Sequence, residues 1–186
     1  MTDKTYLMII LGLGIAGILF HIILHRIGKP YRDSYFRIME NIENGVIKKE
    51  EIMKIGTLKL KEGHAIAFDF DGVIHKYSKG WQDGSIYDEA NLEVLDLILL
   101  LQLSGYPCVI ISTRDPQQIK EWWDAQRFSI RADVLSDYTT FFNDCSYVGI
   151  TNKKLPAQVY VDDRAYKYTG QNTAEFIRDF MWEETE

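Results

Sequence analysis

From residue 63 onward, short apolar runs alternate with segments of helical pattern, and this alternation limits the folds open to the chain. Two runs, of five and six residues, are expected to be buried strands, and a later run of five residues is a further strand candidate; a weaker run lies between the second and the third. The strands are expected at 65–69, 107–112 and 158–162, with the weaker one at 147–150. Short buried strands separated by helices predict an α/β fold, a Rossmann-like three-layer α/β/α sandwich around a parallel sheet.

The helices between these strands carry recognisable ends. A helix is expected over 88–103, with Gly105 as its C-cap. Asp115 and Pro116 are an N-cap followed by proline at the first helical position, and they predict a second helix. Asn172 with Glu175 resembles a capping box and predicts a last helix.

The N-terminus carries a different signal, a run of 19 residues from Tyr6 to Leu24 in which His21 is the sole ionisable group. A helix of that length spans about 28 Å, close to the thickness of a bilayer's hydrocarbon core, so we expect an uncleaved membrane anchor. A signal peptide is the alternative. Gly12, Gly14 and Gly17 match GxGxxG, but no second buried strand with an acidic end follows, which disfavours a dinucleotide site.

The sign of the net charge changes near residue 64, where the α/β pattern begins. Residues 1–64 have a net charge of +3 and residues 65–186 a net charge of −9. Lysine and arginine gather after the apolar run, so the positive-inside rule places the C-terminal part in the cytoplasm. An acidic domain repels a polyanion, which disfavours nucleic acid as a partner. We therefore expect an anchor at 1–27, a linker with a helix over 33–44 at 28–62, and an α/β domain at 63–186.

Polar residues follow three of the expected strands at the point where each ends. Asp69 and Asp71 follow the first, Ser112 and Arg114 the second, and Asp162-Asp163 the last. Ligands of open α/β sheets bind beyond the carboxyl ends of the strands. Carboxylates from two such ends are expected to share one Mg²⁺ ion, which prefers oxygen ligands. Ser112 and Arg114 are expected to supply donors to a phosphate group.

As a set, DFDGV at 69–73, the Ser112-Thr-Arg114 turn, an upstream lysine and Asp162-Asp163 resemble the haloacid dehalogenase-like superfamily of phosphohydrolases. The resemblance covers about residues 64–170. It implies a Mg²⁺-dependent phosphatase in which Asp69 is the nucleophile and Asp71 the general acid and base. It also implies that Asp162 and Asp163 hold Mg²⁺ with Asp69 and the Asp71 carbonyl.

The same resemblance assigns the remaining roles. Ser112 would bind the phosphoryl oxygens, and Thr113 and Arg114 would bind the substrate. Lys153 or Lys154 would steady the phosphoryl charge, and Lys154, beside Leu155-Pro156, is favoured.

The gaps between the motifs leave room for a short flap over 74–87 and for no sizeable cap, so the site is expected to be open. Trp81 and Tyr87 in this flap are candidates for stacking on a ring, with packing as the alternative, and His75 for a structural or substrate-binding role. The leading hypothesis is a membrane-anchored phosphatase of a phosphate monoester. The alternatives are a nucleotide or polynucleotide-end phosphatase and a non-catalytic, membrane-tethered binding protein.

Overall fold

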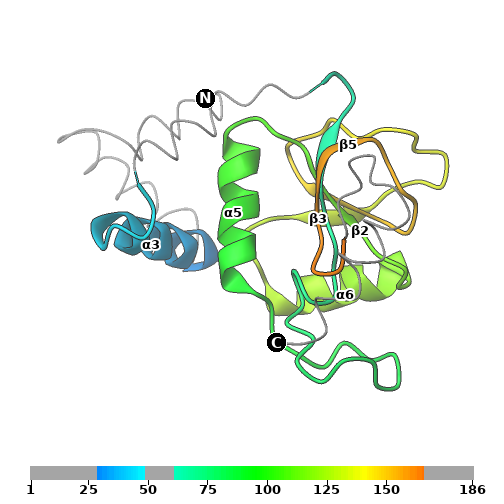
Figure 1. Ribbon diagram of the computed structural model, residues 1–186, viewed down its shortest axis with the longest axis horizontal. Coiled ribbons are helices and arrows are strands. Elements are labelled where there is room, and N and C mark those ends of the chain that lie inside the picture. The colour runs from blue at the N-terminus through cyan, green and yellow to red at the C-terminus, as the bar shows by residue number, and fades with distance from the viewer. Residues whose placement is uncertain (1–28, 49–60, 166–186) are drawn as a thin grey trace, which may run out of the picture.

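The centre of the computed structural model, which describes residues 29–48 and 61–165, is a parallel sheet (Figure 1). Its strands have the order β3-β4-β2-β1-β5, and every neighbouring pair is parallel. The strands are β1 (Ala65–Phe68), β2 (Cys108–Ile111), β3 (Ala132–Val134), β4 (Val148–Thr151) and β5 (Ala157–Val161). The predicted α/β fold with a parallel, Rossmann-like sheet is confirmed. The weak candidate at 147–150 is the strand β4, and β3 is a strand that the pattern did not single out.

The helices in the described residues are α3 (Lys29–Glu43), α5 (Leu92–Leu103) and α6 (Pro116–Gln126). The predicted C-terminal end of α5 and the predicted N-cap of α6 are confirmed. Gly105 follows α5 with a positive φ of 85°, and the Tyr106 amide donates to the Leu101 carbonyl, as in a Schellman motif. The Asp115 side chain accepts a hydrogen bond from the Gln117 amide at 3.0 Å.

Helix α5 begins at Leu92, four residues later than the pattern of its apolar residues predicts. The preceding residues belong to the flap instead. The Asp88 amide donates to the His75 ring, and the Asn91 amide donates to the Ile74 carbonyl. Asn91, the N-cap, has an extended backbone with φ −77° and ψ 101°, so the helix begins after it.

The two helices that follow β1 and β2 cover the same face of the sheet. Ile98 of α5 and Ile119 of α6 belong to one core cluster with Phe68 and Ile110, the inward side chains of neighbouring strands. The opposite face carries Ala67 and Val109, and there Phe142 and Leu155, from connecting segments, complete a smaller cluster. Within 29–48 and 61–165, the second helical layer of the expected sandwich is therefore not seen. The helix expected from Asn172 lies outside the described residues.

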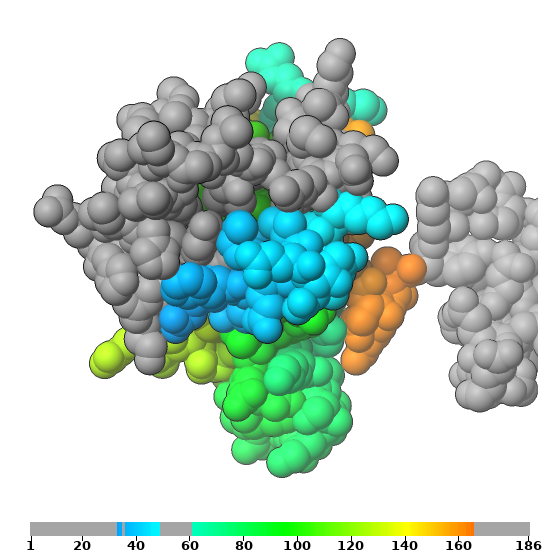
Figure 2. All heavy atoms as spheres, turned by 90° about the vertical axis from the view of Figure 1, so that its left-hand side faces the viewer, coloured from blue at the N-terminus to red at the C-terminus, as the bar shows by residue number. Residues whose placement is uncertain are grey.

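Helix α3 packs against α5, on the side of the molecule that Figure 2 presents to the viewer. Arg37 binds the Asp96 carboxylate with two hydrogen bonds, from Nε at 2.9 Å and from Nη2 at 2.8 Å. Ile38 and Leu100 are buried against each other beside this pair. The helix expected at 33–44 is therefore confirmed, and it docks on the sheet domain.

The apolar run at 6–24 lies outside the described residues. Among the residues that the structure does describe, no helix combines the length and apolar character needed to cross a membrane.

Candidate functional site

The sheet order brings the three predicted strand ends together. Strand β1 lies between β2 and β5, so the segments that follow these strands meet at one edge of the sheet. The Asp69 amide donates to the Val161 carbonyl at 2.8 Å, which ties the end of β1 to the end of β5. The carboxyl ends of adjacent parallel strands are the usual place for a ligand in such sheets.

Three carboxylates gather at this edge. One oxygen from each of Asp69, Asp162 and Asp163 lies within 4.8 Å of the other two. Asp69 is half-buried, whereas Asp162 and Asp163 are exposed. Burial raises the pKa of Asp69 to about 6, against a hydrogen bond from the Phe70 amide, and repulsion from the neighbouring aspartates adds to the increase. An all-oxygen set with excess negative charge fits a hard divalent cation such as Mg²⁺.

A glycine allows this group to form. Gly72 has a φ of 85°, and a Cβ atom placed on it would lie 2.7 Å from Cγ of Asp163. Such a distance is shorter than real Cβ contacts, so a side chain at this position would push the carboxylate away. The glycine of the DFDG sequence thus provides both the left-handed turn and the space for Asp163.

The Asp71 carboxylate does not belong to this group of three and is held by two donors. His75 Nδ1 lies 2.8 Å from Oδ1 of Asp71, and Arg114 Nε donates to Oδ2 at 2.7 Å. The other ring nitrogen of His75 accepts from the Asp88 amide at 2.9 Å. Because Nε2 accepts, the neutral ring carries its proton on Nδ1 and donates it to Asp71. The side chain of Asp71 is therefore outside the acidic group, and any metal contact is left to its carbonyl.

A cavity of about 640 Å³ opens beside these residues. It is lined by Asp69 and Asp71, by the turn after β2, by flap residues and by Arg164; in full, Asp69, Asp71, Tyr77, Trp81, Gly84, Ser112, Thr113, Arg114, Asp115, Gln118 and Arg164. The predicted residues Ser112, Thr113 and Arg114 thus lie in one cavity with the predicted nucleophile. Ser112 is buried and its hydroxyl accepts from the Arg114 amide at 3.3 Å, whereas Thr113 is exposed.

Arg114 is buried and connects three segments. Besides its bond to Asp71, its Nη1 donates to the Gly84 carbonyl of the flap at 2.6 Å. Gln118 Nε2 donates to the same carbonyl at 2.9 Å. The guanidinium that was expected to donate to a phosphate group is therefore partly used within the protein, where it joins the flap to Asp71.

The two candidate lysines do not line this cavity. Lys153 pairs with Asp137, its Nζ lying 3.2 Å from the carboxylate. The Nζ atom of Lys154 lies 5.0 Å from the centre of the Tyr160 ring, in a cation–π contact. Neither ammonium group is among the residues brought together around Asp69. Arg164, which lies 3.5 Å from Asp163 through Nε, is the cation that the sequence reasoning overlooked.

The aromatic residues of the flap have two different roles. The Tyr87 hydroxyl accepts from the Lys79 amide and donates to the Gly80 carbonyl, both at 2.9 Å, so Tyr87 holds the flap's shape. Trp81 lines the cavity and is 69% exposed. His75 is fully buried, with its ring centre 5.2 Å from that of Tyr87, and has a structural position. Its place four residues after Asp71, in DFDGVIH, was the available clue to their contact.

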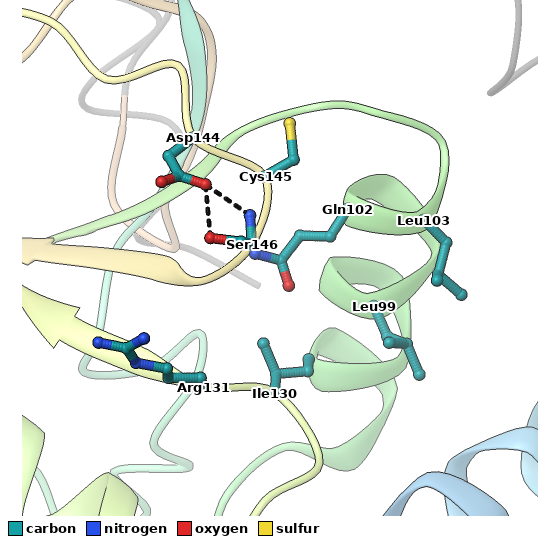
Figure 3. Close-up of a pocket in the computed structure, with 8 residues that line it drawn as sticks. All are labelled: Leu99, Gln102, Leu103, Ile130, Arg131, Asp144, Cys145 and Ser146. Atoms are coloured by element: carbon teal, nitrogen blue, oxygen red, sulfur yellow. Dashed lines mark hydrogen bonds between the residues drawn. The ribbon is translucent and has the colours of Figure 1, made fainter. Parts of the chain in front are cut away.

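A second cavity of about 420 Å³ lies between α5 and the loop that precedes β4 (Figure 3). Leu99, Leu103 and Ile130 form its apolar side, and Asp144 accepts two hydrogen bonds from Ser146 within the loop. None of the predicted site residues lines it. The larger cavity is therefore the candidate functional site.

No protein-family model, no curated protein and no solved structure matches this chain.

Proposed function

We propose that the chain is a Mg²⁺-dependent phosphatase of the haloacid dehalogenase-like type, which hydrolyses a phosphate monoester through an aspartyl-phosphate on Asp69. The observation that carries the proposal is the position of Asp69. Its carboxylate belongs to the group of three aspartates and lines the same cavity as the Ser112 turn. Asp69 thus links the acidic group to the cavity that Ser112 lines, which supports a nucleophile placed between a cation site and a phosphate-binding turn.

Mg²⁺ bound by Asp69, Asp162, Asp163 and the Asp71 carbonyl would neutralise charge on the phosphoryl group. One oxygen of Asp69 attacks phosphorus, and the bond between phosphorus and the ester oxygen breaks. Ser112 donates its hydroxyl proton to a phosphoryl oxygen, and its burial limits competition from water. The leaving oxygen is protonated by Asp71 or, for a weakly basic leaving group, departs without help.

Asp71 acts again, as a base, when the aspartyl-phosphate is hydrolysed. Water attacks phosphorus, its proton passes to the Asp71 carboxylate, and the Asp69 carboxylate is released with inorganic phosphate. His75 and Arg114 hold the Asp71 carboxylate in the cavity that Asp69 also lines, which is where a base for the attacking water is required. For Lys154 to neutralise phosphoryl charge, its ammonium group must leave the Tyr160 ring. Arg164 is the alternative cation, because it already lines the cavity.

The test uses the full-length chain with an aryl phosphate, in Mg²⁺ and in EDTA. We expect turnover in Mg²⁺ alone. Asp69→Asn should reduce turnover to background and form no phosphoenzyme, because the nucleophile is gone. Asp71→Asn should accumulate phosphoenzyme, because the aryl group leaves unaided and hydrolysis slows by about 10²- to 10⁴-fold.

Rapid acid quench and intact mass measure the phosphoenzyme. Asp144→Asn is a matched control, since Asp144 is a loop aspartate outside the site cavity, and it should behave as the wild type. Phosphorylation of the Asp69→Asn protein, or full activity in EDTA, would show that the assignment is wrong. Loss of activity in Lys154→Ala with retention in Arg164→Ala, or the reverse, identifies the neutralising cation.

We further propose that residues 6–24 anchor the chain in a membrane with the phosphatase domain in the cytoplasm. The support is the sequence alone, namely the apolar run and the basic residues that follow it. Membrane fractionation of the full-length chain tests the anchor, and a C-terminal reporter tests the orientation. Recovery in the cytosolic fraction would refute the first part and an exported reporter the second.

A further inference from the structure

The site cavity is much larger than a phosphate group requires. Its volume of about 640 Å³ is in the range of pockets that hold whole small molecules, about 300–1,000 Å³. Besides Asp69 and Ser112, its lining includes Tyr77, Trp81 and Gly84 of the flap. The flap residues are therefore available to the part of a substrate that carries the phosphate.

Several polar groups that line the cavity already form hydrogen bonds within the protein. The Gly84 carbonyl accepts from both Arg114 and Gln118. Asp71 accepts from Arg114 and His75 through its two oxygens. Trp81, by contrast, is a large lining side chain that keeps 69% of its surface exposed. Single exposed aromatic residues are common on protein surfaces. Trp81 is a candidate for ligand binding because it also lines this cavity.

The indole of Trp81 is also held in place before any ligand arrives. The guanidinium carbon of Arg114 lies 5.9 Å from the ring centre, at cation–π distance. The indole edge packs on Gly84, where a Cβ atom would lie 3.6 Å from Cη2 of the ring. The hydrogen bonds to the Gly84 carbonyl fix that contact. An aromatic surface fixed in advance loses little conformational entropy when a planar group stacks on it.

We infer that Trp81 is the specificity-determining residue and that it stacks on a planar aromatic ring in the leaving group of the substrate. The inference rests on the proposed phosphatase function. The substrate class is then a small phosphate monoester with an aromatic or heteroaromatic ring, such as a nucleoside monophosphate or an aryl phosphate. The net charge of −9 over residues 65–186 favours such a small molecule over a polynucleotide end.

The experiment compares three substrates on the full-length chain with Mg²⁺: a nucleoside 5′-monophosphate, phenyl phosphate and the ring-free glycerol phosphate. The measured quantity is the ratio of kcat/KM for each ring-bearing ester to that for glycerol phosphate. Trp81→Ala should lower this ratio about 5- to 150-fold, mainly through KM, because it removes the stacking surface. Trp81→Phe should restore most of it. Tyr138→Ala is the matched control, an aromatic residue 92% exposed and outside the cavity, and should leave the ratio unchanged.

A binding measurement separates this inference from the proposed function. The Asp69→Asn chain is titrated with the same esters by calorimetry, which needs no turnover. Binding of ring-bearing esters that is lost in the Asp69→Asn, Trp81→Ala double variant supports the inference even if the wild type hydrolyses nothing. Turnover whose ratios are unchanged by Trp81→Ala overturns the inference and leaves the phosphatase standing. Absence of both binding and turnover for every ring-bearing ester also overturns it. A Trp81-dependent preference for the nucleotide over phenyl phosphate identifies the ring as a base, and equal preference identifies a simple aryl group; both outcomes support stacking.

Discussion

Replacing Gly72 by alanine tests whether this residue makes room for the acidic group. Gly72 and Gly105 share a φ of 85°, but they differ in their surroundings. A Cβ atom at Gly105 meets nothing within 4 Å, whereas one at Gly72 would lie 2.7 Å from Cγ of Asp163. Gly105→Ala therefore carries the backbone penalty alone, and Gly72→Ala carries the same penalty plus the displacement of a carboxylate.

The magnitudes follow from these two contributions. A side chain in the left-handed conformation costs about 1–2 kcal/mol, which is offset in part because alanine restricts the unfolded chain by about 0.4–1 kcal/mol. We expect Gly105→Ala to lower the free energy of unfolding by about 1 kcal/mol. Gly72→Ala should lower it by about 2 kcal/mol, since moving Asp163 off its preferred rotamer adds about 0.5–1.5 kcal/mol.

Urea unfolding of the full-length chain, with and without Mg²⁺, measures both effects. Wild type and Gly105→Ala should gain similar stability from Mg²⁺. Gly72→Ala should need about tenfold more Mg²⁺ for the same gain, because one carboxylate has left the group. Equal stability losses in the two variants, together with an unchanged Mg²⁺ dependence, would refute the reasoning.

Three further predictions follow from the charged groups. Arg37→Ala should lower the free energy of unfolding by about 1–3 kcal/mol in the same urea titration, because Asp96 is buried and loses two hydrogen bonds. Arg131→Ala, whose pair with Asp133 is exposed, should lower it by about 0.5 kcal/mol or less, and equal losses in the two variants would contradict this. Because the pKa of Asp69 is raised in the folded chain, the free energy of unfolding should fall as pH increases from about 4 to about 6, by about 1 kcal/mol after allowance for the partial exposure of Asp69. This fall should be absent in Asp69→Asn, and a variant with the same pH dependence of stability as the wild type would exclude the Asp69 carboxyl as its source. Ca²⁺ should not replace Mg²⁺ in the turnover of an aryl phosphate, since it prefers more ligands at longer distances, and comparable rates with both ions would count against the site.

The sheet and the ends of its helices were accessible from the sequence because they depend on local chemistry. Apolar runs marked β1, β2 and β5, and Asp115 and Gly105 marked helix ends. The convergence of the aspartates was accessible as well, since parallel strands place their carboxyl ends at one edge. Strand β3 was missed because its three residues, Ala132–Val134, include the charged Asp133 and one exposed position, which leaves too short an apolar pattern.

Side-chain partners between distant segments were not accessible. Arg114 follows β2 and Asp71 follows β1, and nothing local indicates that they bind each other rather than a phosphate group. The same holds for Lys154, whose contact with Tyr160 depends on the loop between β4 and β5. The half-burial of Tyr87 and the exposure of Trp81 likewise depend on the folded shape of the flap, because nothing in the sequence distinguishes the two residues.

The ring of His75 has a consequence for the protection of the flap's backbone against solvent exchange. Its Nε2 atom is the acceptor for the Asp88 amide, and the ring has no exposed surface. The Lys76 amide beside it donates to the Glu89 carbonyl, so the base of the flap is joined on both sides. Hydrogen exchange at Asp88 should therefore require opening of the ring's packing with Phe70 and Tyr87, and should be slow relative to the tip around Gln82. The Asp88 amide thus reports whether the flap remains attached to the loop that carries Asp71.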